Sequence, residues 1–187
     1  MNEEIQFVLD EAAESMQNAL KHFERELQKI RAGKASPQML ERVKVDYYGT
    51  LTPIDQVSNI NTPDPRQIIV QPWDKSMLPV IEKAIMAANL GFNPQNNGEV
   101  LRIQVPQPTE ERRRELVKIV KNEAENARVA VRNIRRSSNE AAKKLEKMGA
   151  PEDVVKLLEK DIQVLTDKNI ALIDQMMEAK EKEVMTV

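Results

Sequence analysis

The sequence has 187 residues, a formal net charge of −2, one histidine and no cysteine. A chain of this length can bury a hydrophobic core in one or two domains. The near-neutral charge excludes a protein that coats nucleic acid non-specifically, and the lack of cysteine excludes disulfides and thiolate metal sites. The acidic N-terminal segment lacks the apolar run of a signal peptide, and no segment reaches about 18 consecutive apolar residues, so we expect a cytoplasmic protein without a membrane span.

The first predicted element is a helix from Glu3 to about Arg31. Its apolar residues recur every three or four positions, which is the spacing of one helix face, and the stripe is wide enough to contact two neighbours. The stripe consists of Ile5, Val8, Leu9, Ala12, Met16, Ala19, Leu20, Phe23, Leu27 and Ile30. His22 lies off this stripe and has no partner in an evident motif, so we expect it at the surface.

From residue 32 to residue 105 the helical period is replaced by short alternating runs, beginning with the helix breakers Gly33 and Pro37. The runs predict strands at residues 43–48, 54–60, 67–71 and 100–105, and a helix at residues 76–88. Together they predict a small inserted α+β domain. Tyr47, Tyr48 and Trp73 are expected to pack in its core, with a base-stacking platform as the alternative.

The longest predicted element is a helix from Thr109 to Met148, which contains neither Pro nor Gly. Thr109 is a candidate N-cap, and Gly149 follows where the helix should end. At 1.5 Å per residue this helix is about 60 Å long. An apolar stripe runs along one side of it.

The opposite side of this helix is cationic. Arg114, Lys121, Arg128 and Arg135 follow one another at intervals of seven residues, and Arg132 lies between the last two. Seven residues at about 100° each return to within about 20° of the starting direction, so these side chains share one face of a straight helix. Arginine is the better bidentate partner for phosphate. Because the whole chain is near neutral, this local excess indicates a chosen docking face, with an ordinary solvated face as the alternative.

A final helix begins near Pro151. Its apolar seam, with the spacing of a coiled coil over more than three heptads, consists of Val155, Leu158, Ile162, Leu165, Asn169, Leu172, Met176 and Ala179. We interpret Asn169 as a buried polar residue that fixes the register of the helices, in preference to a chemical role.

These elements predict an α+β protein with two domains. Residues 1–31 and 106–187 form a discontinuous, coiled-coil-like bundle of three long helices, and residues 32–105 form the inserted β/α/β domain. We expect a rod with a small lobe at one end, an L shape. The chain crosses twice between the domains, so a hinge is predicted at Arg31, Ala32, Gly33, Lys34, Val105 and Pro106.

The sequence contains no recognisable catalytic set. It has no glycine-rich loop that would cradle a phosphate, and one histidine without cysteine removes the usual pairs of nucleophile and base. The carboxylates lie mostly beside Lys or Arg on helix surfaces, which is typical of solvated ion pairs. We therefore expect no enzyme, no metal site and no cofactor.

Five segments carry a resemblance to a known family: IRAGKASPQML, VDYYGTLTPIDQV, EKAIMAANLGFNP, TEERRRELVKIVKNEAENARVAVRNIRR and the continuation SSNEAAK. In these segments, and in their order along the whole chain, the sequence closely resembles ribosome recycling factors. The resemblance implies an L-shaped, monomeric protein of tRNA-like size that is not an enzyme. It also implies binding to 23S rRNA of the 50S subunit after peptide release, and subunit separation with elongation factor G and GTP.

The resemblance further implies that Arg113, Arg132 and Arg135 contact rRNA. Lys121, Arg128 and Arg114 are candidates only because they lie on the cationic face.

Two other classes of protein remain open from the residues alone. One is a coiled-coil adaptor with a merely solvated basic face, which would oligomerise and have no affinity for ribosomes. The other is a membrane-surface protein with a basic amphipathic helix, against which the apolar stripe is rich in alanine and lacks Trp and Phe.

Overall fold

The computed structural model describes residues 1–31 and 33–186. The helices and strands are, in chain order, α1 (Asn2–Lys29), β1 (Lys44–Tyr47), β2 (Thr50–Pro53), β3 (Ser58–Asp64), β4 (Gln67–Pro72), α2 (Leu78–Ala87), β5 (Pro94–Asn96), β6 (Leu101–Gln104), α3 (Glu110–Lys147) and α4 (Glu152–Met185). Short 3-10 turns lie at Pro37–Leu40, Ile54–Gln56 and Lys75–Met77. The chain divides into two compact units. One comprises Met1–Arg31 and Glu110–Thr186, and the other comprises the chain from residue 33 to Thr109.

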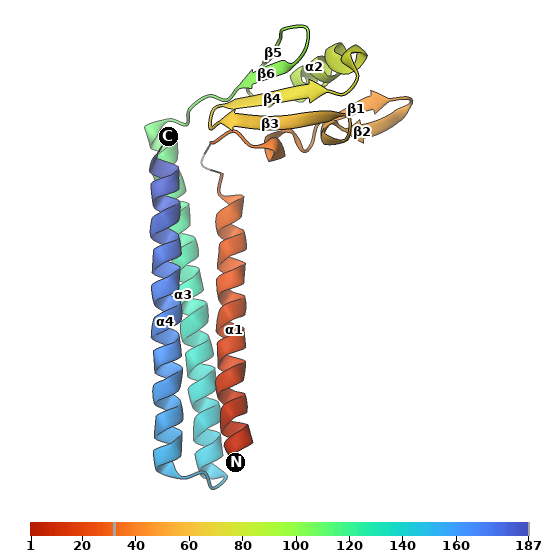
Figure 1. The fold of residues 1–187 in the computed structure, drawn as a ribbon. Helices are drawn as coiled ribbons and strands as arrows, with labels where there is room; N and C mark the ends of the chain where they lie inside the picture. Colours follow the sequence, from red (N-terminus) through yellow and green to blue (C-terminus); the bar gives the residue numbers. More distant parts are fainter. Residues whose placement is uncertain (32, 187) are drawn as a thin grey trace. The chain divides into compact units, whose positions relative to one another are not determined.

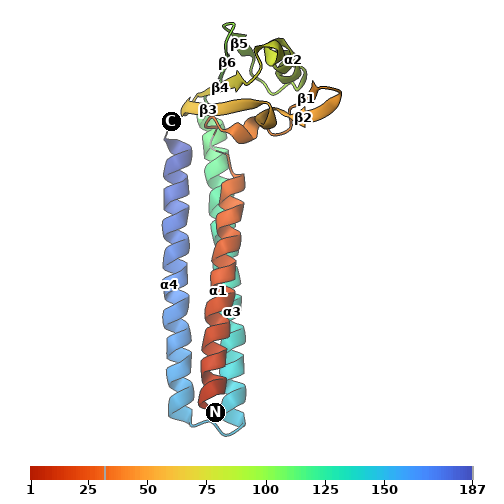
Figure 2. The same cartoon turned by 45° about the vertical axis from the view of Figure 1, so that its right-hand side comes forward.

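The first unit is a bundle in which α1, α3 and α4 lie side by side, and the two views in Figures 1 and 2 agree on this. The helices form because their apolar residues follow the 3.6-residue period, so each has one face to bury. The interior includes the fully buried side chains of Met16, Phe23, Leu158, Ile162 and Ile173. The predicted α+β architecture with a bundle of long helices is confirmed.

The turn between α3 and α4 reverses the chain, which makes these two helices antiparallel. Gly149 has a φ of 106°, a left-handed conformation that residues with a Cβ rarely adopt. The next amide, of Ala150, donates to the carbonyl of Leu145 at 3.0 Å and so satisfies a carbonyl at the end of α3. The predicted helix end at Gly149 is confirmed.

The buried seam of α4 differs from the predicted one at several positions. Leu172 is 37% exposed, whereas Ile173 beside it is fully buried, and Thr166 is buried where Leu165 was expected. Thr166 can occupy the interior because its hydroxyl donates to the carbonyl of Ile162 at 2.8 Å. Asn169 is buried as predicted, and its side-chain amide donates to the Leu165 carbonyl at 2.8 Å.

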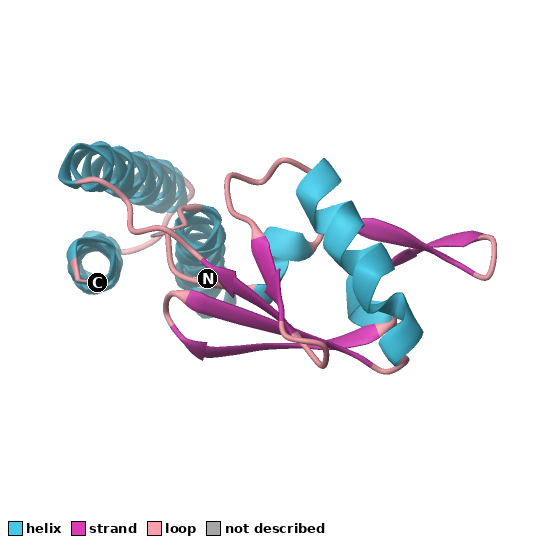
Figure 3. Ribbon diagram, turned by 90° about the horizontal axis from the view of Figure 1, so that it is seen from above, coloured by secondary structure: helices cyan, strands magenta, loops and turns pink. Residues whose placement is uncertain are grey.

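The second unit contains two antiparallel sheets. Strands β1 and β2 form a two-stranded hairpin, and the other four strands form a sheet in the order β3-β4-β6-β5. Helix α2 covers one face of the four-stranded sheet (Figures 1 and 3). Leu78, Ile81 and Ile85 of α2 belong to the same buried cluster as Ile68 of β4 and Ile103 of β6. This cluster is the core of the unit and is separate from the interior of the bundle.

The sequence prediction was incomplete for the short strands. The run at residues 54–60 was predicted as one strand, but Ile54–Gln56 form a 3-10 turn and β3 begins only at Ser58. Strands β2 and β5 were not predicted. Each contains a proline, Pro53 in β2 and Pro94 in β5, and a proline weakens the sequence signal of a strand although an edge strand accepts it.

The expectation that the aromatic residues pack in this core was wrong. Tyr48 is 85% exposed and Trp73 is 64% exposed. Tyr47 and Tyr48 contact each other edge to face, with ring centroids 4.6 Å apart, at the end of the β1–β2 hairpin. The aliphatic residues of β4, β6 and α2 fill the core without them.

Candidate nucleic-acid interface

The predicted cationic residues all lie on α3, which positions them along one long helix of the bundle. This helix buries Leu116, Val120, Ala124, Ala127, Val131, Ser138 and Ala142. Its remaining sides carry the charged residues. Glu110 and Glu111 stand in the first turn and Lys144 and Lys147 in the last, an arrangement that the helix dipole favours.

Three of the predicted cations extend to the surface with little restraint. Lys121 is exposed and Arg135 is half-buried, and within the described part of the chain neither has an ion-pair partner. Arg114 is exposed and pairs with Glu110 one turn earlier at 2.7 Å. Both side chains of that pair are in solvent, so it holds Arg114 only weakly. These cations are therefore accessible to a phosphate.

Arg128 differs from the other members of the cationic face. Only 18% of its side chain is exposed. Its Nε and Nη2 donate to Oδ1 of Asp174 on α4 at 2.9 and 2.7 Å, and its Nη1 donates to Glu125 at 3.0 Å. The carboxylate of Asp174 raises the pKa of Arg128 further above its ordinary value. All three guanidinium nitrogens thus have partners, and the residue joins α3 to α4.

Arg132 lies one turn beyond Arg128 and is more accessible, with 39% of its side chain exposed. Its Nη1 donates to Oε1 of Glu125 at 3.2 Å, whereas Arg128 binds the other oxygen of the same carboxylate. The hydrogen bond from Arg128 is the largest cause that lowers the pKa of Glu125, and the hydrogen bond from Arg132 is the next. The carboxylate therefore stays ionised at neutral pH.

Arg113 lies near the first turn of α3 and is half-buried. Its Nη1 approaches the carbonyl oxygen of Met185, the last residue of α4, at 3.5 Å. This contact sits at the limit of a hydrogen bond, and Nε is buried without a partner among the described residues, so the terminal nitrogens are the donors that a ligand could reach.

From the sequence, no role was assigned to Asp174 or to Glu125. The position of Glu125 was readable in part, because acids three residues before and seven residues before an arginine reach it on a helix. The position of Asp174 was not, since it depends on how α4 lies against α3.

The residues predicted as a hinge are placed as follows. Arg31 is the last residue of the first segment of the bundle unit, two residues after α1 ends at Lys29, and Ala32 lies outside the described residues. Gly33 has a φ of 75°, and a Cβ there would lie 3.0 Å from Pro108, so glycine is required where the two crossings approach each other. Lys34 and Pro106 are exposed. Val105, by contrast, is 5% exposed and belongs to the core of the second unit.

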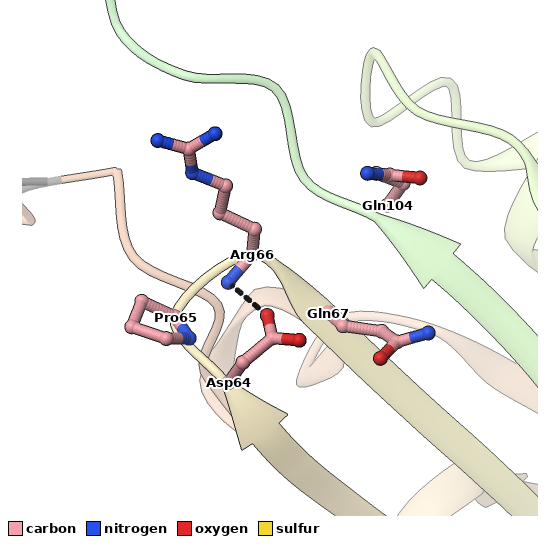
Figure 4. A pocket seen from close by; sticks show the side chains of 5 residues that line it. All are labelled: Asp64, Pro65, Arg66, Gln67 and Gln104. Atoms are coloured by element: carbon pink, nitrogen blue, oxygen red, sulfur yellow. Dashed lines mark hydrogen bonds between the residues drawn. The ribbon is translucent and has the colours of Figure 1, made fainter.

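The turn between β3 and β4 fastens both crossings to the sheet. The amide of Ala35 donates to the Pro65 carbonyl, and the amide of Val105 donates to the Arg66 carbonyl, each at 2.7 Å. Asp64 closes the turn by accepting the Arg66 amide at 2.8 Å, while the Arg66 side chain points away from that carboxylate (Figure 4). A shallow recess beside this turn is also lined by Gln67 and Gln104.

The described residues contain no group of three His, Cys, Asp or Glu side chains that could hold a metal ion. Among the helices of residues 1–31 and 33–186, none combines the length and the apolar character that crossing a membrane requires.

Comparison with known proteins gives a consistent result along the chain. Residues 23–185 match the family described as ribosome recycling factor. The chain is 56% identical to the ribosome-recycling factor of Flavobacterium psychrophilum over 187 residues, which is the full length of both proteins. It is 52% identical to that of Geobacillus sp. over 184 residues, covering 98% of this chain and 100% of the relative.

Solved structures agree with the sequence comparison. A solution structure of the ribosome recycling factor matches with a TM-score of 0.69 and 43% identity, covering 98% of each chain. A second structure, which matches with a TM-score of 0.58 and 43% identity over 97% of this chain and 98% of the other, represents the T. thermophilus ribosome recycling factor and the E. coli elongation factor G bound to the E. coli post-termination complex. With a match from residue 23 to residue 185 and more than half of all positions identical to a full-length relative, the chain belongs to the ribosome recycling factor family.

Proposed function

We propose that this protein binds the large ribosomal subunit after termination and, together with elongation factor G and GTP, separates the post-termination complex into subunits. The observation that carries the proposal is membership of the ribosome recycling factor family over the full length of the chain. The similar protein of known structure on a post-termination complex with elongation factor G supports the choice of partners.

The part of the protein that contacts the ribosome is, in this proposal, the cationic face of α3. Arg113, Arg132 and Arg135 would bind phosphates of 23S rRNA, and Arg114 and Lys121 would extend the same face. Each phosphate that a cation neutralises releases counterions, so binding should weaken steeply with salt. A protein with a net charge of −2 can bind rRNA in this way because the cations gather on one helix.

We propose further that the protein has no catalytic activity of its own and needs no cofactor or metal. GTP hydrolysis is then the work of elongation factor G. The protein acts as a monomer in the cytoplasm, where its ribosomal partner is found.

The two domains, residues 1–31 with 106–187 and residues 32–105, are proposed to move relative to each other at the two crossings. The β3–β4 turn holds Ala35 and Val105 to the second unit, so a bend of the two crossings would lie before Ala35 and after Val105. The notion can be tested with dyes on cysteines introduced at Glu14 in α1 and Lys83 in α2, since the chain has no cysteine of its own. A broad distance distribution supports a hinge, and one narrow distance in the free protein refutes it.

Gly33 is a poor site for a rigidifying proline. Proline fixes φ near −65°, whereas Gly33 has a φ of 75°, so Gly33→Pro would change the path of the chain and not only its stiffness.

The experiment that tests the proposed function is a splitting assay. Purified post-termination complexes are mixed with the protein, elongation factor G and GTP, and dissociation is followed by light scattering. The proposal expects subunit separation only when all three are present. Separation without elongation factor G, or none with the complete mixture of cognate components, contradicts it.

A further inference from the structure

Arg128 stands at the centre of a chain of ion pairs that runs from α4 to the exposed side of α3. Asp174 holds it from α4 with two hydrogen bonds, at 2.9 and 2.7 Å. Arg128 in turn donates to one oxygen of Glu125 at 3.0 Å, and the other oxygen of Glu125 accepts from Arg132 at 3.2 Å. The order along this chain is Asp174, Arg128, Glu125, Arg132.

The exposure of the two arginines divides their roles. The Arg128 side chain is 18% exposed and each of its nitrogens already has an acceptor, so a phosphate could bind it only in competition with Asp174 or Glu125. The Arg132 side chain is 39% exposed, and only its Nη1 has an acceptor among the described residues. Its free donors can receive a ligand while Glu125 keeps the guanidinium in place.

We propose that Arg128 is a positioning residue for rRNA binding: anchored on Asp174, it holds Glu125, and Glu125 holds the guanidinium of Arg132 where a phosphate can bind it. This inference rests on the proposed function, since it concerns how the same face is prepared for rRNA. An exposed arginine that is fixed before binding loses less rotational freedom when the phosphate arrives.

The proposal and direct phosphate binding by Arg128 predict opposite effects for Asp174→Asn. The substitution removes a negative charge and loosens Arg128. If Arg128 bound phosphate itself, its release and the lost negative charge would strengthen binding. If Arg128 positions Arg132, binding weakens although the protein has become less negative.

Glu125→Asp provides a test without any change of charge. The shorter side chain cannot reach both arginines, so Arg132 is released while the net charge is unchanged. We expect about three- to tenfold weaker binding for Glu125→Asp and for Asp174→Asn, which corresponds to the loss of about one hydrogen-bonded restraint.

The measurement is co-sedimentation with purified 50S subunits at one fixed salt concentration, with both substitutions made in the wild type and in Arg132→Ala. The matched control is Glu152→Gln, which also removes one negative charge from α4. Glu152 forms an exposed ion pair with Lys156, with Nζ and Oε1 2.7 Å apart, and lies far along the helix from this network. The control should leave 50S binding within about 1.5-fold of the wild type, as expected for an exposed pair.

The proposal is supported if Glu125→Asp and Asp174→Asn weaken binding when they are made in the wild type but cause no further loss when they are made in Arg132→Ala. A merely structural role would weaken binding equally in both backgrounds. Unchanged or tighter binding, or equal losses in the two backgrounds, overturns it. Circular dichroism verifies folding, and if Asp174→Asn unfolds the bundle, Glu125→Asp decides alone, because Glu125 is 54% exposed. If the wild type itself does not sediment with 50S subunits, the proposed function fails and not this inference alone.

Discussion

Phe23 makes the bundle a suitable place to test how the three helices are held together. Its side chain is 1% exposed and is among the largest fully buried side chains of the protein. Phe23→Ala removes a ring from a close-packed interior and leaves a cavity, which costs about 3–5 kcal/mol. A domain of this size is stable by about 5–15 kcal/mol, so the loss is a large part of the total. With a urea m-value of about 1–3 kcal/mol/M, the unfolding midpoint should fall by at least about 1 M.

The same helix offers a matched control in Phe7, whose side chain is 65% exposed. Phe7→Ala makes the identical chemical change at the surface, where the expected effect is within about 0.5 kcal/mol. Both variants are followed by urea unfolding with far-ultraviolet circular dichroism, to which the three long helices contribute most of the signal. Equal costs for the two substitutions, or a cost below about 1 kcal/mol for Phe23→Ala, would refute the described interior of the bundle.

Three further predictions concern other parts of the molecule. Asn169→Leu should raise the free energy of unfolding, because a buried amide is replaced by an apolar side chain. It should also permit other helix registers or oligomers, and sedimentation velocity would detect the oligomers. A lower stability with an unchanged monomer would contradict this prediction. Ile81→Ala should lower the free energy of unfolding of the second unit alone by about 2–5 kcal/mol. The fluorescence of Trp73 should then change at a lower urea concentration, while the unfolding of the bundle followed by circular dichroism stays unchanged. A shift of both transitions would contradict this by showing that the units unfold together. The pKa of Glu125 lies below its ordinary 4.5, so its ion pairs stabilise the folded state above that pH, and this contribution disappears as the pH falls through the lowered value. The difference in Tm between wild type and Glu125→Gln should therefore be constant from neutral pH to about pH 5 and vanish in stronger acid. A difference that grows in acid would be inconsistent with the assigned pairs.

The long helices could be predicted because their periodicity extends over many turns. The exact seam was harder to obtain where two residues compete, as with Leu172 and Ile173. The prediction chose Leu165 over Thr166 on hydrophobicity. The structure buries Thr166 because its hydroxyl bonds within the helix, and this contact makes burial acceptable.

The short strands and the aromatic residues were predicted less well, for a different reason. A strand of three or four residues with a proline, such as β5 with Pro94, has no period to detect, and its pairing with β6 is a contact between separate segments. Tyr48 and Trp73 are exposed because aliphatic residues from several separate segments fill the core, and local sequence patterns do not show how those segments assemble.

The candidate site shows the same division between local and distant contacts. Spacing along α3 was sufficient to gather Arg132, Arg135 and Lys121 on one face. It placed Arg128 with them, but the partner that withdraws Arg128 from solvent is Asp174 on another helix. The role of a charged residue in a bundle therefore depends on its neighbours across the interface as much as on its own face.

Salt-dependent co-sedimentation with 50S subunits tests most directly whether the cationic face of α3 binds rRNA. The wild type is compared with a variant that carries Arg132→Ala and Arg135→Ala. We predict that the wild type binds, and that the double variant binds more weakly with a slope of log K against log salt that is shallower by about 1.4–1.8, as expected for two lost phosphate contacts. A wild type that fails to bind at any salt concentration, or a double variant with unchanged affinity and slope, would contradict the claim.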